Sequence, residues 1–336
     1  MNEKLKKVAN VIVLALVTCL VLYFSLKDNF NTIINEIINV NIFWLVISFL
    51  LALSFWFFKA IATTRIANIF KKDYSIKQGM RLVLETNFFH AITPFAVGGQ
   101  PYEIYSLKKS KLKITEATNV SIVNFIVYQI ALVLLGIIAI VYNHHFVLLK
   151  ENDLLKNLVV VGFLVNFIVI VALFLLTCTK KINKILMKFI IKVLNKIHLV
   201  KNKDEKIKQF NEYLNEFHQG AKILLQDKKL FIKLIFVHFI GLISSYLIPL
   251  TLAYAMGISS YTGIEAIVLS SYVMLIGAFV PIPGGTGGLE YGFMTFYGSF
   301  IKGSKLNAIM LLWRFITYYF AMILGAILLG IRKKEK

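Results

Sequence analysis

Cysteine and proline are scarce in this chain of 336 residues, which contains two cysteines and five prolines. Both cysteines, Cys19 and Cys178, lie inside apolar runs, where a thiol behaves as a small apolar side chain. A disulfide framework is therefore not expected. His144 and His145 are adjacent, which is not the spacing of a metal-binding pair on one helix face. We expect neither a metal site nor a cofactor.

Catalytic signatures are missing as well. The sequence contains no Walker loop, no His-Glu-x-x-His pair, no Gly-x-Ser-x-Gly elbow and no Asp-x-Asp motif of a sugar transferase. Motifs therefore give no support to an enzymatic function.

Acidic residues are also scarce. The chain has 17 Asp and Glu against 37 Lys and Arg, which gives a formal net charge of +20. The chain is 58% hydrophobic and its mean hydropathy is +0.74, values typical of an integral membrane protein. The basic residues lie next to apolar runs, where anionic lipid headgroups attract them. We therefore expect anionic membrane lipids as partners, and no nucleic acid.

Long apolar runs dominate what is present. A span needs about 20 residues to cross the hydrocarbon layer. Six runs reach that length: 8–26, 41–63, 118–141, 155–178, 231–256 and 306–331. The first resembles a signal peptide, but it is long for one and no small-residue cleavage site follows, so we interpret it as a retained helix.

Two further apolar segments, 79–107 and 264–300, are interrupted by proline and glycine. Residues 93–103 read TPFAVGGQPYE and residues 280–290 read VPIPGGTGGLE. Hydrocarbon leaves a free backbone N–H or C=O unsatisfied, so broken backbone at membrane depth must be buried in protein or reached by water. Each segment is predicted to be a re-entrant hairpin, or two shorter helices that meet at the Gly-Gly pair.

Orientation follows from the basic residues that flank the spans. With the N-terminus in the cytoplasm, all Lys and Arg fall on the cytoplasmic side except Arg314, inside the last span, and five outer lysines: Lys27, Lys150, Lys156, Lys302 and Lys305. The two broken hairpins then enter from opposite faces, as in an inverted-topology repeat. Two unrelated helix kinks are the alternative.

The predicted fold is thus an all-α, polytopic membrane protein with about six full spans and two re-entrant hairpins. Both termini lie in the cytoplasm, and residues 1–336 form one transmembrane domain. Within it, residues 179–230 form a cytoplasmic basic linker. Its first part carries a lysine at every fourth position over 180–196 with apolar residues between, which predicts an amphipathic helix on the membrane surface.

Ionisable side chains inside apolar runs are the candidate site residues, because burying them costs about 2.5–3.5 kcal/mol. Arg314 is predicted to bind a phosphate, with a structural ion pair to Glu290 as the alternative. Glu290, with Glu103, is predicted to bind the substrate by offsetting a cationic aminoacyl group. The alternative for Glu103 is a place at the cytoplasmic interface beside Lys108 and Lys109. His238 is predicted to be a hydrogen-bonded packing residue. The half-helices that follow the breaks offer free N–H groups to an anion, which adds these residues to the site: Gly98, Gly99, Gln100, Pro283, Gly284, Gly285, Gly287 and Gly288.

These residues also carry a resemblance. The segment NFFHAITP at 87–94, the continuation through 98–105, the segment PIPGGTGGLE at 281–290 and Arg314 resemble the transmembrane region of the lysylphosphatidylglycerol synthase and flippase family, over essentially the whole chain. The sequence departs from many relatives at 99–101, where Gly-Gln-Pro stands in place of Gly-Glu followed by a basic residue. The role of Glu103 and the identity of the lipid therefore stay open.

The resemblance implies an all-helical fold with re-entrant segments and a role in moving aminoacylated phospholipid to the outer leaflet. Full-length members add a cytosolic aminoacyltransferase domain, which is absent here, so synthase activity is not expected. Our leading hypothesis is a translocase of the bacterial cytoplasmic membrane for an anionic or aminoacylated phospholipid such as lysylphosphatidylglycerol. The alternatives are a membrane-embedded transferase, with Glu290 as its base, and a non-catalytic partner of a separate aminoacyl-phospholipid synthase.

Overall fold

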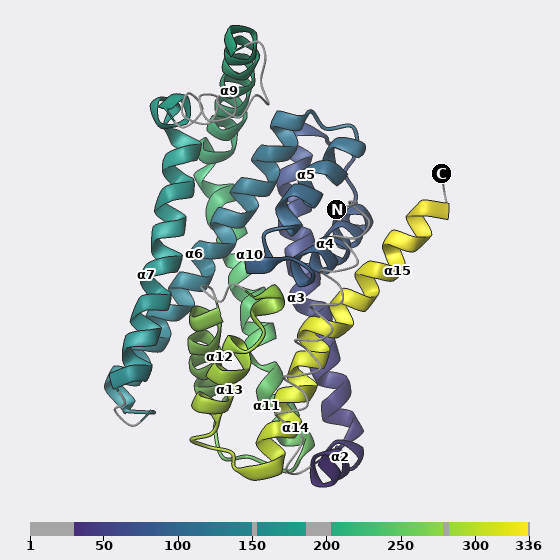
Figure 1. The fold of residues 1–336 in the computed structure, drawn as a ribbon, viewed down its shortest axis with the longest axis vertical. Helices are drawn as coiled ribbons and strands as arrows, with labels where there is room; N and C mark the ends of the chain where they lie inside the picture. The colour runs from purple at the N-terminus through teal and green to yellow at the C-terminus, as the bar shows by residue number, and fades with distance from the viewer. Residues whose placement is uncertain (1–29, 150–152, 186–202, 278–281, 335–336) are drawn as a thin grey trace.

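The computed structural model describes residues 30–149, 153–185, 203–277 and 282–334, and all regular structure within these ranges is helical (Figure 1). The predicted first span, 8–26, lies outside the described residues. So do Pro281 of the second break and most of the predicted surface helix after residue 185. The all-α prediction is confirmed for the described part of the chain.

Five helical stretches are long and apolar enough to cross a membrane. They include α3 (Ile42–Phe70), α6 (Ile114–Phe146), α7 (Asp153–Cys178), α10 (Lys228–Tyr246) with α11 (Ile248–Ala255), and α14 (Gly303–Arg314) with the π-helical turn η3 (Phe315–Tyr319) and α15 (Phe320–Lys334). These match the five predicted spans after the first, and α3 and α6 run several residues beyond them. The chain is therefore a multi-pass membrane protein.

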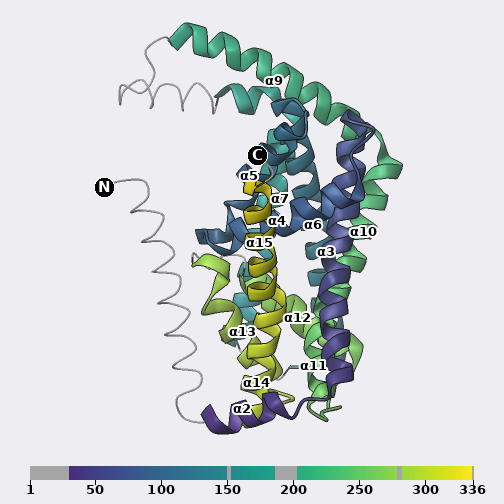
Figure 2. The same ribbon diagram turned by 90° about the vertical axis from the view of Figure 1, so that its right-hand side faces the viewer.

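Two broken hairpins lie between the spans. The first consists of α4 (Ile76–Ala91), η1 (Pro94–Ala96) and α5 (Gly99–Lys109), and the second of α12 (Gly263–Gly277), η2 (Pro283–Gly285) and α13 (Gly288–Tyr297). Figures 1 and 2 place α4 and α5 in the upper half of the molecule and α12 and α13 in the lower half. The tips η1 and η2 contact each other. The prediction of two opposed re-entrant hairpins is confirmed.

The bend in the first hairpin does not fall where we predicted it. Phe95 and Ala96 have φ of 53° and 53°, whereas Gly98 is in the right-handed region and Gly99 begins α5. Gly98 and Gly99 instead allow the backbone to pass close to the side chains of Thr93 and His90. A Cβ on Gly98 would lie 2.5 Å from Thr93 Cγ2, and one on Gly99 would lie 2.1 Å from the His90 ring. Two non-glycine residues with positive φ are strained backbone, which only the surrounding packing can hold.

The second hairpin bends as predicted, at glycine. Gly284, Gly285 and Gly287 have φ of 66°, 65° and 89°, a region that glycine enters without steric cost. The half-helix α13 is then held from its other side by aromatic stacking. The ring of Phe293 lies 4.4 Å from that of Tyr297 and 4.9 Å from that of Trp313 on α14. The tip of this hairpin is thus fixed against the last span.

The described part of the basic linker forms α9 (Lys203–Gln226), which lies across one end of the molecule (Figure 2). It is held there by polar contacts to the spans. Thr115 donates to Glu216 at 3.0 Å, Asn119 donates to the carbonyl of Phe217 at 2.9 Å, and His218 pairs with the carbonyl of Thr177 at 2.9 Å. The short helix α2 (Phe30–Ile38) lies at the opposite end. These two ends define the polar faces of the bundle.

Candidate functional site: a polar cavity at the meeting of the two hairpins

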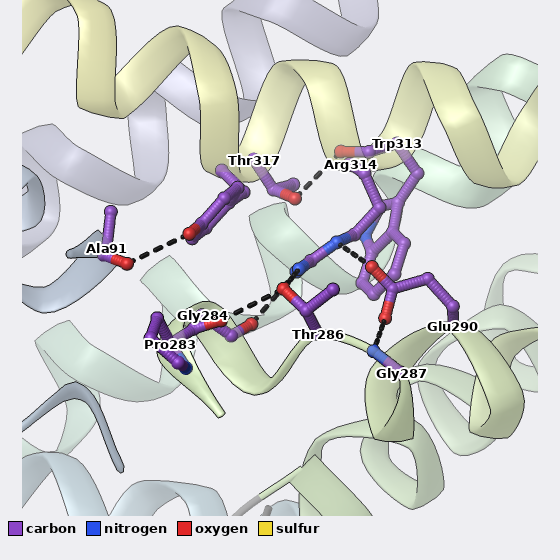
Figure 3. Close-up of polar contacts among 10 residues, drawn as sticks. Ala91, Pro283, Gly284, Thr286, Gly287, Glu290, Trp313, Arg314 and Thr317 are labelled. Atoms are coloured by element: carbon purple, nitrogen blue, oxygen red, sulfur yellow. Dashed lines mark hydrogen bonds and ion pairs between the residues drawn. The ribbon is translucent and has the colours of Figure 1, made fainter. Parts of the chain in front are cut away.

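A buried ion pair holds the tip of the second hairpin. Arg314, at the end of α14, is 4% exposed, and its Nε lies 2.7 Å from Oε1 of Glu290 on α13. Its Nη2 donates to the carbonyl of Gly284 at 3.1 Å and to Thr286 Oγ1 at 3.3 Å (Figure 3). The second oxygen of Glu290 accepts the N–H of Gly287 at 2.7 Å. The ion pair that the sequence offered as the alternative role of Arg314 is therefore present.

Tyr318 joins this clamp to the first hairpin. Its hydroxyl donates to the carbonyl of Ala91, the last residue of α4, at 2.9 Å. Its ring lies 4.6 Å from the Arg314 guanidinium and covers Gly284, where a Cβ would come within 2.2 Å of the ring. Tyr318 belongs to the π-helical turn of the last span, a local geometry common at functional sites. One side chain thus touches both broken hairpins.

The first hairpin has a clamp of its own. Glu85 on α4 is fully buried and accepts from Arg81 Nε at 2.9 Å and from the hydroxyl of Tyr102 on α5. Arg81 also donates to the carbonyl of Leu328 on α15 at 3.3 Å. Each hairpin is therefore closed by a buried glutamate, and each is tied to the last span.

A cavity of about 800 Å³ lies where the hairpins meet α3, α6, α7 and α10. Its apolar lining includes Phe55, Trp56, Val165 and Leu289. Its polar lining includes Lys59, Thr63, His90, Gln100, Glu103, Ser121, Asn124, Tyr128, Gln129, Asn166 and His238. Phe95 and Val97 at the tip of the first hairpin border the cavity and are 57% and 59% exposed, so the cavity reaches the surface there.

Glu103 lies in this wall. It is 8% exposed, and Ser121 on α6 donates to its Oε2 at 2.8 Å. The alternative that Glu103 sits at the interface beside Lys108 is wrong, because α5 turns this face toward α6. Its carboxylate borders the space in which a ligand would lie.

A chain of hydrogen bonds crosses the cavity wall from α10 to α3. His238 Nε2 pairs with Asn124 Oδ1 at 2.9 Å, Asn124 Nδ2 donates to Thr63 Oγ1 at 3.0 Å, and Thr63 donates to the carbonyl of Lys59 at 3.0 Å. His238 is thus a hydrogen-bonded residue, as predicted, and it also lines the cavity. The chain ends at the backbone carbonyl of Lys59, one turn before Thr63 on α3.

Asn124→Leu should break this chain at its centre. It leaves the His238 ring without its partner, whereas the Thr63 hydroxyl loses the Asn124 donor but keeps its bond to the carbonyl of Lys59. An unsatisfied buried polar group costs about 1–3 kcal/mol. We expect a loss of that size in the free energy of unfolding, measured by thermal and denaturant unfolding in detergent. Asn157→Leu, at an exposed position of α7, is the matched control and should change little. Equal stability of both variants would contradict the assignment.

The predicted site residues divide into two groups. Gln100, Glu103, Gly284 and Gly285 line the cavity. The others lie at or behind the hairpin tips: Gly98, Gly99, Pro283, Gly287, Gly288, Glu290 and Arg314. Their part in binding a substrate stays a prediction, and the observed contacts of Arg314 and Glu290 are with the chain itself.

Sequence reasoning missed Lys59. The count of basic residues assigned it to the cytoplasmic flank of its span, yet it lines the cavity. The available signal was its setting between Phe55 and Ala62 in a run without another charge, since a lone charge in an apolar run marks a site.

Comparison with known proteins agrees with this architecture. The chain is 23% identical over 303 residues to a UPF0104 membrane protein of Archaeoglobus fulgidus, and the alignment covers 84% of each chain. Residues 10–325 match the family described as the lysylphosphatidylglycerol synthase TM region. This match spans both hairpins and the described spans up to residue 325, within the last of them. The chain therefore belongs to the lysylphosphatidylglycerol synthase transmembrane-region family.

Proposed function

We propose that this protein is a lipid translocase that moves an anionic or aminoacylated phospholipid, such as lysylphosphatidylglycerol, between the leaflets of the bacterial cytoplasmic membrane. The observation that carries the proposal is the cavity of about 800 Å³ between two opposed broken hairpins. Its volume is within the range of about 300–1,000 Å³ typical of small-molecule sites. Sites for polar substrates lie at such broken helices in many transporters.

The wall of the cavity suits an amphiphile. Lys59, Glu103 and the amides of α6 and α7 offer contacts to a headgroup, while Phe55, Trp56 and Leu289 offer contacts to acyl chains. The exposed border at Phe95 and Val97 supports an opening through which a lipid enters with its tails outside. A water-soluble solute would need no apolar wall of this kind.

The hairpin tips have a mechanical role in this proposal. The Arg314–Glu290 pair and Tyr318 hold η2 against η1 and so define one wall of the cavity. Opening toward the second leaflet then requires the tips to part, with the half-helices as rigid units. Glu290 is poorly placed as the base of a transferase, because Arg314 and the N–H of Gly287 engage both its oxygens.

Orientation and partners complete the proposal. The end of the molecule that carries α9 also carries the lysines at 71–77, 108–113 and 180–184, which supports a cytoplasmic position for it beside anionic lipids. A separate aminoacyl-phospholipid synthase would deliver its product at that face.

The test is leaflet exchange in reconstituted vesicles. We expect the protein to accelerate exchange of fluorescent phosphatidylglycerol or lysylphosphatidylglycerol over protein-free vesicles. Glu103→Gln, which keeps the shape and removes the charge in the cavity, should slow exchange at least about tenfold, or 1.4 kcal/mol. Glu212→Gln, on the exposed face of α9, should exchange at the wild-type rate. If the wild type exchanges neither lipid, the proposed translocase function is refuted. If Glu103→Gln leaves the exchange rate unchanged, the lipid does not pass through the cavity.

A further inference from the structure

Lys59 is the only lysine or arginine among the described residues that line the cavity. It extends from α3, and its Nζ lies 5.5 Å from the ring centroid of Phe55 and 5.7 Å from that of Tyr128. Aromatic faces attract a cation weakly, by about 0.5–2 kcal/mol. They do not accept the hydrogen bonds that an ammonium group offers.

The donors of Lys59 are free for a ligand. Within the described ranges, its Nζ makes no hydrogen bond, and no carboxylate oxygen lies within the 4.0 Å of an ion pair. Neighbouring polar groups are engaged elsewhere, since Thr63, Asn124 and His238 bond to one another and Ser121 donates to Glu103. An ammonium with three donors thus faces a cavity whose other polar groups are largely satisfied.

The unused donors of Lys59 point to an anionic ligand group beside it. Glu103 also lines the cavity, where its Oε2 accepts from Ser121 and, within the described part of the chain, takes no hydrogen bond from Lys59. His90 bonds through Nδ1 to the carbonyl of Ala96, and His238 bonds through Nε2 to Asn124, so one nitrogen of each ring is already engaged. A lysine acts as a point charge toward phosphate, which suits a headgroup that must later leave.

We infer that Lys59 binds the phosphate group of the transported molecule. This inference rests on the proposed function and gives the cavity its ligand class, a phosphate ester. Arg314 is then a structural residue, and the phosphate lies on the α3 side of the hairpin tips.

Binding of soluble probes to the detergent-purified protein tests the inference. The probes are dioctanoyl-phosphatidylglycerol, dioctanoylglycerol, which lacks the phosphate, and inorganic phosphate, with affinity measured by calorimetry. We expect the wild type to bind the phospholipid, and Lys59→Met to bind it at least about tenfold more weakly, a change of about 1.4 kcal/mol. Lys59→Arg should retain most of the affinity because it keeps the charge. Lys77→Met, at an exposed lysine of α4, should bind as the wild type does.

The other arms separate the sources of affinity. Binding of dioctanoylglycerol should be weak and equal in the wild type and Lys59→Met, and inorganic phosphate should bind only if the acyl chains are dispensable. Equal phospholipid affinity in the wild type and Lys59→Met, or no binding by the wild type, would overturn the inference. If phospholipid binding depends on Lys59 but no leaflet exchange occurs, only the proposed translocase function is refuted. If exchange is as fast in Lys59→Met as in the wild type, only the role of Lys59 in binding phosphate is refuted.

Discussion

Arg314→Met is expected to lower the free energy of unfolding by about 3–5 kcal/mol, the cost of removing one partner from a buried ion pair. The variant leaves the Glu290 carboxylate, 7% exposed, with only the N–H of Gly287 as a partner. It also frees the carbonyl of Gly284 and the hydroxyl of Thr286. Unfolding by heat and by denaturant in detergent measures the loss, and leaflet exchange should fall with it because the tip of the second hairpin is released.

A double-mutant cycle separates the ion pair from the other contacts of Arg314. Glu290→Gln alone leaves the guanidinium without its counter-charge and should also be strongly destabilising. Arg314→Met combined with Glu290→Gln removes both charges, and we expect it to be more stable than the sum of the single losses predicts. Arg65→Met, at an exposed position of α3, should stay within about 0.5 kcal/mol of the wild type. Strict additivity in the cycle would argue against an energetic role for the pair.

Gly284→Ala is the second change for which we expect a large effect. A side chain at φ of 66° is strained, by about 1–3 kcal/mol, and the new Cβ would lie 2.2 Å from the ring of Tyr318. The ring cannot swing aside cheaply, because its hydroxyl is bonded to Ala91 and the Arg314 guanidinium lies over its face. Overpacking adds about 1–3 kcal/mol, so the total loss of unfolding free energy is expected to be about 2–6 kcal/mol.

Gly287→Ala supplies the matched control for that prediction. Its φ of 89° is also positive, but a Cβ there would meet no atom within 4 Å. It should show the backbone strain without the clash, and so a smaller loss in the same unfolding measurement. Adding Tyr318→Ala should rescue part of the loss in Gly284→Ala and none of the loss in Gly287→Ala. Equal losses in the two alanine variants would mean that Tyr318 does not fix the tip.

Both predictions concern one physical problem, the exposed backbone of a broken helix. Residues at the tips cannot satisfy all their carbonyls within a helix, and lipid offers no donors. Arg314 supplies one donor to Gly284, and Tyr318 supplies one to Ala91. The last span thus caps both breaks with side-chain donors from successive turns. The buried guanidinium of Arg314 thus has partners in the carbonyl of Gly284 and the carboxylate of Glu290. Lys59 is the cation that lines the cavity among the described residues.

Much of the fold could be predicted because the constraints are local. The thickness of the hydrocarbon layer sets the length of a span. Every backbone N–H and C=O must be hydrogen-bonded in lipid, so a span is helical and a proline–glycine interruption of it stands out in the sequence. The two proline–glycine segments therefore identified the hairpins, and charged residues in apolar runs identified Arg314, Glu290 and Glu103 as buried groups. The positions of the bends were less predictable, since Phe95 and Ala96 adopt positive φ only because packing imposes it.

Only the tertiary structure decided which buried charge faces the cavity. Arg314 and Lys59 both lie in apolar sequence, and nothing local distinguishes their roles. Contacts between distant segments separate them: η1 meets η2, Tyr318 reaches Ala91, and α13 presents Glu290 to Arg314. Lys59 shares the cavity with Glu103 but forms no ion pair with a carboxylate of the described residues. The sequence by itself determined that the protein spans the membrane and that two of its apolar segments are broken helices, whereas long-range packing determined which charged side chains line the cavity.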